Sequence, residues 1–464
     1  SEAIYYLDRF INKFPNFSKI NEVYFYLGLS YYVKGKYEKA VEYLSIVKEK
    51  RISNLSKAIF YLARSFEGLK NYEKAKETYL IIIDDYPKTE FAPQAFYQYY
   101  LLIGNIDEFK SFEASFKKHC SESEYYNKYI WDLVLGKIKL KDWQSALNIL
   151  NNASDNSYDL TEQAKILFWQ GKLFDLSGNS EQAKIKFKEC VRKYPFSYYT
   201  YRILTQYLVN YDSNIFRNYI KDTKKLTIEK YSWLYDVGLK DLAIKELEAI
   251  KKQDQKFDLK EAYMLSYLYF LDKNYYESIK ILAQKVDIHA YFQKYQEVPR
   301  SFLELLYPLG PVEIIKNHAT FYNKEPELVL GVIRRESAFK HNAYSRSNAI
   351  GFMQIMPKTG KGIADQLAEE WRGEKNLEDK DLNIKYGTYY LTHLAGRFNN
   401  NYIYMLSAYN AGPNRTQKWI NEIDFNDLDY FVVKIPYDET QKYVPFVLEN
   451  YWIYKNLYQF GDEK

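Results

Sequence analysis

FYLGLSYYVKGKYEKAVEYL, residues 25–44, and FYLARSFEGLKNYEKAKETYL, residues 60–80, are two copies of one pattern. The triplet FYL and the tetrapeptide YEKA both recur in register, at an offset of 35 residues. Each copy reads as a helix, a short turn at Gly35 or at Lys70 and Asn71, and a second helix. Tandem helix hairpins therefore predict an all-α fold for this part of the chain.

A third copy, FWQGKLFDLSGNSEQAKIKFKECVRKYP at 168–195, keeps small residues at Gly171, Gly178 and Ala183, and a looser copy begins at Met264. The pattern resembles tetratricopeptide repeats, in which small residues lie where paired helices approach closely. One such unit cannot bury its apolar face alone, so neighbouring units are expected to stack into a curved superhelix. Most of the 50 tyrosines are then packing residues of helix pairs rather than a ligand-binding set.

The character of the sequence changes after about residue 307. Pro308 and Pro311 precede a helix expected from Val312, and Pro326 is placed to begin a second helix at its first turn. Glycines and polar stretches become denser, while strand-like alternation is nearly absent. We therefore expect three parts: a helical-repeat superhelix over 1–225, a helical linker domain over 226–306 and a compact, mostly helical domain over 307–464.

Composition argues against several classes of protein. Hydrophobic residues make up 47% of the 464 residues, and charged residues of both signs are interleaved at 27%, which argues against disorder. The net charge of +5 is too small to indicate a nucleic-acid partner, and no apolar run is long enough to cross a membrane. The five histidines show no metal-ligand spacing. Cys120 and Cys190 fit one disulfide or two buried thiols equally well.

The first 15 residues already have the apolar pattern of a helix, with one face formed by Ile4, Leu7, Phe10, Ile11 and Phe14. The sequence therefore begins inside a structural element. We expect residues upstream that are missing here, removed either as a signal peptide by processing or by the choice of fragment.

One carboxyl group continues a buried helical stripe in the third part. Val329, Val332 and Ile333 precede Glu336 at helical spacing. Burial disfavours the charged form of a carboxyl and raises its pKa, as a general acid at neutral pH requires. The alternative is a structural glutamate, paired with a neighbouring arginine or exposed where the helix ends.

Four blocks of sequence then point to one family. They are ESAF at 336–339, GFMQIMPKT at 351–359, SAYNAGPNR at 407–415 and IPYDETQKYVPFVL at 435–448. In this order and spacing they resemble the catalytic domain of soluble lytic transglycosylases, and the segment at 383–394, with Gly387 and Tyr390, resembles a helix of that family. The resemblance implies a mostly helical, lysozyme-like catalytic domain that follows a TPR-like superhelix closed into a ring.

The same resemblance implies roles for individual residues. Glu336 matches the family's single catalytic acid/base. Six positions match substrate contacts: Ser345 at the acetamido group, Gln354 and Met356 along the sugar groove, Tyr409 and Asn410 beside the glutamate, and Glu439 in the acidic position that fixes this region. Three of these residues have a structural alternative. Met356 could pack in the core, Asn410 could cap a helix or turn, and Glu439 could form an ion pair with Lys442. No metal or organic cofactor is implied.

The chain departs from the family pattern at four positions. Asn348 and Asn414 stand at frequent glycines, Phe352 at a common leucine and Gln441 at a frequent arginine. Asparagine tolerates left-handed backbone better than most residues, so we expect both asparagine-containing loops to keep their shape.

Glu336 is the only acidic residue from position 336 through 358. Ordinary glycosidases use two carboxylates, whereas one suffices if the nucleophile belongs to the substrate. With the resemblance, this predicts a lytic transglycosylase that cleaves the β-1,4 bond between N-acetylmuramic acid and N-acetylglucosamine and leaves a 1,6-anhydromuramoyl end. Two alternatives stay open: a goose-type muramidase that hydrolyses the bond, and a catalytically inactive helical-repeat adaptor that binds peptidoglycan.

The resemblance also predicts where the protein works and what it meets. Peptidoglycan glycan strands are the expected partner, and enzymes of cell-wall synthesis or hydrolysis are candidate protein partners. The expected location is the periplasm, with no integral membrane segment and no nucleic acid involved.

Overall fold

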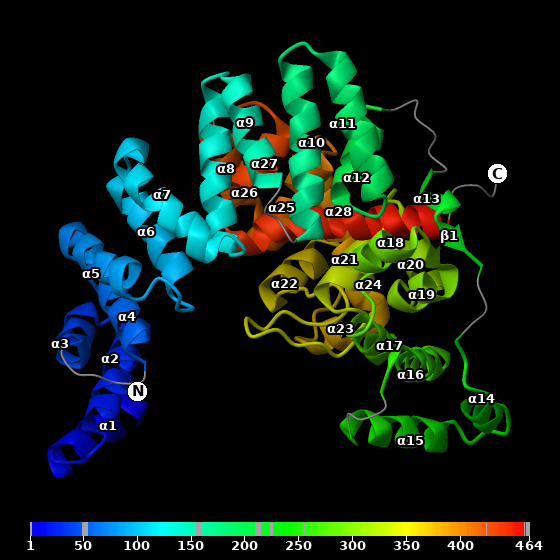
Figure 1. Cartoon of the computed structure of the whole chain (residues 1–464). Helices are drawn as coiled ribbons and strands as arrows, with labels where there is room; N and C mark the ends of the chain where they lie inside the picture. The colour runs from blue at the N-terminus through cyan, green and yellow to red at the C-terminus, as the bar shows by residue number, and fades with distance from the viewer. Residues whose placement is uncertain are drawn as a thin grey trace. The chain divides into compact units, whose positions relative to one another are not determined.

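Helices form nearly all of the regular structure in the computed structural model, which describes residues 2–48, 54–154, 159–208, 215–222, 226–253, 257–423, 425–458 and 460 (Figure 1). The prediction of an all-α chain is confirmed. The chain divides into two compact units, Ser1–Asp159 and Leu160–Lys464. The boundaries expected near residues 225 and 306 both lie inside the second unit and stay predictions, as does closure of the repeats into a ring.

The first unit consists of consecutive helices in which neighbours in the sequence pack against each other. Their bounds are α1 (Glu2–Lys13), α2 (Ile20–Val33), α3 (Tyr37–Lys48), α4 (Leu55–Gly68), α5 (Tyr72–Asp85), α6 (Ala92–Ile103), α7 (Ile106–Cys120), α8 (Glu124–Lys139) and α9 (Trp143–Ser154). Large aromatic side chains such as Phe25, Tyr79 and Phe96 lie fully buried between these helices. The tyrosine-rich composition thus serves helix packing, as the repeat pattern predicts.

The second unit begins with the hairpin of α10 (Leu160–Leu176) and α11 (Ser180–Lys193). The two helices approach so closely at Gly171 that a Cβ there would lie 2.6 Å from the Phe187 ring. Asn179 ends the turn between them and accepts a hydrogen bond at its side chain from the Gln182 backbone nitrogen at 3.2 Å. This hairpin has the close approach predicted for the third repeat copy.

Shorter elements connect this hairpin to the C-terminal part. Their bounds are α12 (Tyr198–Gln206), α13 (Ile215–Asn218), β1 (Ile220–Lys221), α14 (Glu229–Asp236), α15 (Lys240–Gln253), α16 (Leu259–Leu271), α17 (Tyr275–Ala283), α18 (Ile288–Tyr295), β2 (Val298–Pro299) and α19 (Arg300–Leu306). The hairpin of α16 and α17 coincides with the looser repeat that begins at Met264. β1 and β2 pair in parallel and form the only named sheet in the described ranges.

The C-terminal part is a bundle of helices arranged around α28 (Figure 1). Its elements are α20 (Val312–Phe321), α21 (Pro326–Glu336), α22 (Pro357–Gln366), α23 (Lys375–Glu378), α24 (Lys380–Arg397), α25 (Tyr402–Ala411), α26 (Pro413–Glu422), α27 (Leu428–Lys434) and α28 (Asp438–Tyr458). The helices expected from Val312 and Pro326 are both present. α28 packs against α21, α25 and α27, and also against α12 and α13 of the preceding segment.

Two further sequence features concern the chain as a whole. Cys120 and Cys190 are both buried free thiols, so the structure has no bond between them. Burial raises the pKa of Cys120 to about 11. None of the helices in the described residues combines the length and the apolarity required to span a membrane.

α24 packs closely against the loop that precedes α22. Gly387 of α24 faces Met353, and a Cβ on Gly387 would lie 2.7 Å from the Met353 Cβ. Met353 is fully buried, and its backbone nitrogen donates a hydrogen bond to Asn383 Oδ1 at 2.8 Å. The absence of a side chain at 387 therefore lets the loop pack directly on α24.

We expect Gly387→Ala to lower the free energy of unfolding by about 1–3 kcal/mol, because the new methyl group overlaps Met353 in a packed core. Gly396→Ala is the matched control in the same helix, where nothing lies within 4 Å of the added Cβ. This control should leave stability unchanged or raise it by up to about 1 kcal/mol, since alanine favours helix. Denaturant unfolding of both variants measures the difference, and equal stabilities would contradict the packing argument.

Candidate functional site

Glu336 is the last residue of α21, a helix that begins with Pro326 in its first turn. Val329, Val332 and Ile333 on the same helix are fully buried. The Glu336 side chain continues this stripe and keeps only part of its surface open to solvent. The stripe expected from the spacing is therefore present, with a carboxyl at its end.

Tyr443 holds this carboxyl from the neighbouring helix. It lies in α28 and donates a hydrogen bond from Oη to Glu336 Oε1 at 2.6 Å. Two arginines, Arg334 and Arg335, directly precede Glu336, and Arg334 donates from Nε to the Leu306 carbonyl oxygen at 2.7 Å instead of pairing with it. The guanidinium of the other, Arg335, lies 5.0 Å above the Phe446 ring centre.

Burial is the main cause that raises the pKa of Glu336 to about 7. The hydrogen bond from Tyr443 and the charge of Arg335 lower this pKa, because both stabilise the carboxylate. The charge of Glu439 raises it. A carboxyl with such a pKa exists in both protonated and ionised forms at neutral pH, which is the requirement for a group that first gives and then takes a proton.

Tyr409 of α25 lies close enough to Glu336 for the two groups to interact electrostatically. Burial, and then the charge of Glu336, raise the pKa of the Tyr409 phenol well above its ordinary value. Its Oη donates to the Met353 carbonyl oxygen at 2.8 Å, and its ring lies 5.5 Å from that of Tyr390. The phenol is therefore neutral and fixed in orientation, and its oxygen can still accept a hydrogen bond from a ligand.

Asn410 and Glu439 form a second polar group beside the site. Asn410 Nδ2 donates to Glu439 Oε1 at 3.4 Å, and Thr440 donates from Oγ1 to Asn410 Oδ1 at 2.6 Å. These contacts join α25 to the first turn of α28. The side chain of Asn410 therefore bridges two helices, which goes beyond the capping role considered as its alternative.

Ser345 shapes the loop between α21 and α22. Its Oγ accepts hydrogen bonds from the backbone nitrogens of Ser347 at 3.2 Å and Ala349 at 2.8 Å. Asn348, inside this turn, has a φ of 65°, so the left-handed conformation expected there is present. Since the oxygen accepts in both contacts, the hydroxyl hydrogen is available to a carbonyl oxygen such as that of an acetamido group.

Gln354 and Met356 lie in the second half of the same loop. Gln354 Nε2 donates to the carbonyl oxygens of Gly351 at 2.9 Å and Ala343 at 3.1 Å, so this side chain closes the turn. Met356 is 41% exposed directly before α22. The alternative of a core methionine is therefore wrong, while its groove-lining role stays a prediction.

The backbone conformation at Asn414 differs from the left-handed one that we expected. It lies in the first turn of α26, a right-handed helix, and accepts a hydrogen bond at Oδ1 from Arg397 Nη2 at 2.9 Å. The left-handed backbone anticipated at this position is wrong, because Pro413 begins the helix one residue earlier. A glycine is not required here for conformation.

The structure gathers Tyr409 and Glu439 around Glu336, with Asn410 joined to Glu439, and places the other three predicted residues on the loop after α21. Tyr443 was missed, although it sits in the quoted block 435–448, four residues after Glu439 and hence one helical turn further on the same face. Within the described residues, no group of three or more His, Cys, Asp or Glu side chains is arranged to hold a metal ion.

Comparison with known proteins agrees with this architecture. Residues 313–431 match the family described as the transglycosylase SLT domain, and residues 22–51, 57–89 and 166–197 match the tetratricopeptide repeat. The resemblance to soluble lytic transglycosylases is thereby confirmed, and the repeat matches cover the first three copies read from the sequence.

Among the curated relatives, two soluble lytic murein transglycosylases each match about a third of this chain. The soluble lytic murein transglycosylase of Salmonella typhimurium is 34% identical over 148 residues, which are 32% of this chain and 23% of that protein. That of Escherichia coli strain K12 is 33% identical over 163 residues, 35% of this chain and 25% of that protein. The chain thus matches about a quarter of the length of these relatives.

Two solved structures share the fold over nearly the whole chain. An inactive mutant of the lytic transglycosylase Slt from Pseudomonas aeruginosa gives a TM-score of 0.65 at 17% identity, covering 97% of this chain and 75% of that chain. The 70 kDa soluble lytic transglycosylase from Escherichia coli gives 0.56 at 17% identity, covering 97% and 85%. The predicted combination of helical repeats with a lysozyme-like domain is confirmed as a fold.

Tyr443→Phe should raise the pKa of Glu336 further above its ordinary value, by roughly one pH unit, because a hydrogen bond to the charged form is lost. The pKa is measured by ¹³C NMR of glutamate-labelled protein, with the Glu336 resonance assigned by its absence in Glu336→Gln. Tyr437→Phe, at an exposed tyrosine just before α28, is the matched control and should leave the titration unchanged. A lowered or unaltered pKa in Tyr443→Phe would contradict the role of this hydrogen bond.

Glu336→Gln should stabilise the fold at alkaline pH. The unfolded chain loses this proton near pH 4.5 and the folded protein near pH 7, so ionisation costs stability only as the pH rises between these values. Removing the ionisable group should raise the free energy of unfolding at pH 8 by about 1–3 kcal/mol and change it little at pH 4. Urea unfolding at the two pH values measures this, and an equal effect at both would refute it.

Proposed function

We propose that the chain is a lytic murein transglycosylase with Glu336 as its single acid/base, because residues 313–431 match the transglycosylase SLT domain family. The bond cleaved is the β-1,4 linkage between N-acetylmuramic acid and N-acetylglucosamine, and the product carries a 1,6-anhydromuramoyl end. One observation supports this above the others: a partly buried carboxyl with a pKa of about 7 ends α21 inside that domain.

The proposed reaction uses one carboxyl twice. Protonated Glu336 gives its proton to the bridging oxygen as the bond from that oxygen to the muramoyl C1 breaks. The muramoyl C6 hydroxyl oxygen then bonds to C1, and its proton passes to the Glu336 carboxylate. The acid is regenerated and no water is consumed, so the substrate supplies the nucleophile that a second carboxylate supplies in ordinary glycosidases.

The neighbouring groups have separate tasks in this scheme. Tyr443 donates to the Glu336 carboxylate at 2.6 Å and so stabilises the ionised form that follows the first proton transfer. Ser345 has a hydroxyl hydrogen free to meet the muramoyl acetamido oxygen. Tyr409 and Gln354 orient the sugar, and Met356 and Asn410 line the groove. Glu439 binds substrate from the first turn of α28.

Substrate and location follow from the same premise. Peptidoglycan glycan strands are the proposed substrate, the periplasm is the proposed location, and other cell-wall enzymes are candidate protein partners. The helical repeats are proposed to present the glycan strand to the C-terminal domain, because repeat arrays offer extended binding surfaces.

Hydrolysis of the same bond is a second candidate, because a second carboxylate lies within electrostatic reach of the first. The charge of Glu439 raises the pKa of Glu336, and Asn410 holds the Glu439 carboxylate at 3.4 Å. In an inverting hydrolase, a second carboxylate activates the attacking water. Glu439 is therefore the residue that would act as the second carboxylate of a muramidase.

The two reactions are separated by digesting purified sacculi in ¹⁸O-labelled water and identifying the released muropeptides by mass spectrometry. Transglycosylation gives anhydromuramoyl ends without ¹⁸O, whereas hydrolysis gives reducing ends that contain it. The rate should fall as the pH rises through about 7, because the acid form of Glu336 is lost. Labelled reducing ends as the main product would overturn the transglycosylase proposal.

Two variants assign the carboxylates. Glu336→Gln should reduce the rate by about 10²–10⁴-fold with the fold retained, as expected for removal of a general acid. Glu439→Gln should abolish a hydrolase that depends on it to activate water, but only weaken substrate binding by a transglycosylase. Full activity of Glu336→Gln would remove this residue from the mechanism.

A further inference from the structure

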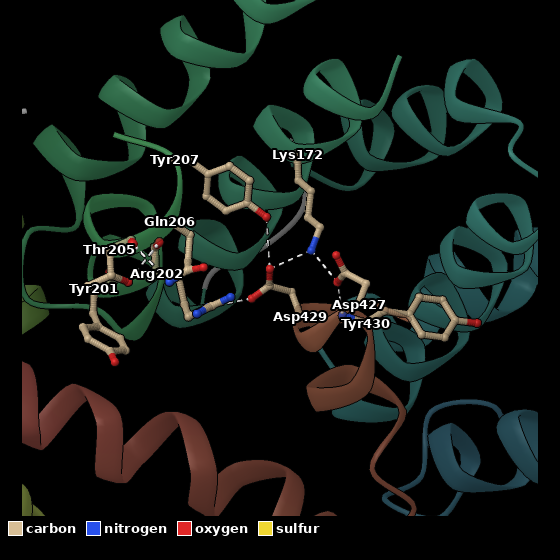
Figure 2. A network of polar contacts seen from close by, with 9 residues as sticks. All are labelled: Lys172, Tyr201, Arg202, Thr205, Gln206, Tyr207, Asp427, Asp429 and Tyr430. Carbon is tan, nitrogen blue, oxygen red and sulfur yellow. Dashed lines mark hydrogen bonds and ion pairs between the residues drawn. The ribbon is translucent and has the colours of Figure 1, made fainter. Parts of the chain in front are cut away.

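A buried cluster of charged side chains joins the helical repeats to α27 (Figure 2). Lys172 Nζ of α10 lies 2.5 Å from Asp427 Oδ1 and 2.6 Å from Asp429 Oδ2. Arg202 of α12 donates from Nε to Asp429 Oδ1 at 2.7 Å, and Tyr207 donates from Oη to Asp429 Oδ2 at 3.2 Å. Lys172, Arg202 and Asp429 are all buried. Side chains more than 200 residues apart in sequence thus meet at one carboxylate.

The cluster contains two cations and two carboxylates and is therefore balanced in charge. Burial alone would raise the pKa of Asp429, but the charges of Lys172 and Arg202 lower it to about 2. Asp429 is consequently ionised throughout the neutral range. Separating buried charges from their partners leaves them unpaired in a poorly hydrated place, which is strongly unfavourable. The cluster therefore resists any displacement of α27 from α10 and α12.

On its other sides, α27 contacts both helices that surround Glu336. The Phe431 ring of α27 lies 4.9 Å from the Tyr404 ring of α25, at an angle of 85°. Gln441 in the first turn of α28 donates from Nε2 to the Val433 carbonyl oxygen at 2.6 Å, at the end of α27. α25 carries Tyr409 and Asn410, and α28 carries Glu439 and Tyr443. A displacement of α27 would therefore displace α25 and α28 as well.

The side of α27 that faces α25 and α26 borders a hollow as well as packed side chains. A hollow of about 280 Å³ lies there, lined by Tyr404, Ile420, Ile423, Phe425, Asn426 and Phe431. Dense side-chain packing normally fixes a helix. With a hollow on one side, the charged contacts on the other side add to the packing that fixes α27.

We propose that Lys172 of the third repeat and Arg202 of the adjoining α12 set the geometry around Glu336 by holding Asp429 and hence α27, so that Tyr443 keeps its place at the carboxyl. The proposal rests on the acid/base role of Glu336 proposed above. Asp429 touches neither substrate nor reacting atoms in this scheme and acts as a positioning residue. The repeats thereby contribute to the reaction itself as well as to substrate presentation.

Asp429→Asn in the full-length chain tests this, because it removes the charge and keeps the shape. We expect kcat/KM on purified sacculi to fall by about ten- to a hundredfold, as for a small misplacement of reacting groups. The pKa of Glu336, followed by ¹³C NMR, should rise, because a displaced Tyr443 stabilises the carboxylate less. The alkaline limb of the pH–rate profile should move in the same direction.

Leu247→Ala is the matched control for lost stability. Leu247 is fully buried in the core formed by α14, α15 and α16, away from the charged cluster. This variant should lower Tm and leave both kcat/KM and the Glu336 titration unchanged. If Asp429→Asn does not fold, the charge-balanced double variant Lys172→Met with Asp427→Asn replaces it, since the pair of Arg202 and Asp429 stays intact.

The outcomes separate this proposal from the proposed function. A folded Asp429→Asn protein with unaltered kcat/KM and an unaltered Glu336 titration, but a lower Tm, would overturn the positioning role and leave the transglycosylase proposal standing. A wild-type protein that releases no muropeptides would refute the proposed function. The NMR titration then still decides the positioning role, because it requires no activity.

Discussion

A carboxyl kept largely from water at the end of α21, and held there by a phenol from α28, is the constraint on which the rest of the C-terminal domain depends. Neither helix could provide it alone. α21 supplies the apolar stripe that removes hydration from Glu336, and α28 supplies the donor that prevents its pKa from rising further. Asn450 of α28 donates from Nδ2 to the Gly331 carbonyl oxygen at 3.3 Å, which ties the two helices together near the middle of α21.

The surrounding groups act on the same carboxyl from different elements. Glu439 disfavours the carboxylate by its charge, whereas Arg335 favours it, so the pKa near neutrality results from opposing influences. The loop after α21 is shaped by its own side chains, since Ser345 and Gln354 both bond to its backbone. The residues expected to contact sugar thus also define the shape of the surface that sugar would meet.

Local patterns in the sequence were enough to predict the repeats, the start of α21 at Pro326 and the position of Glu336 at the end of a buried stripe. These features depend on spacing within one or two helices. The bond from Tyr443 joins residues 107 positions apart, and the carboxylate of Glu439 approaches from the same distant helix. Such contacts arise from how helices pack and have no signature in local periodicity. The prediction for the backbone at Asn414 was wrong for a different reason, because Pro413 begins a helix where a loop was assumed.

The charged cluster of Lys172, Arg202, Asp427 and Asp429 has a consequence for how this chain can vary over evolution. A change of sign at any one of these four positions leaves a buried charge without its partner, so substitutions there must occur together. Exchange of the segment that carries Lys172 and Arg202 without the segment that carries Asp427 and Asp429 should therefore destabilise the C-terminal unit unless the charges match. A chimera should retain this contact when both halves carry the same four charges.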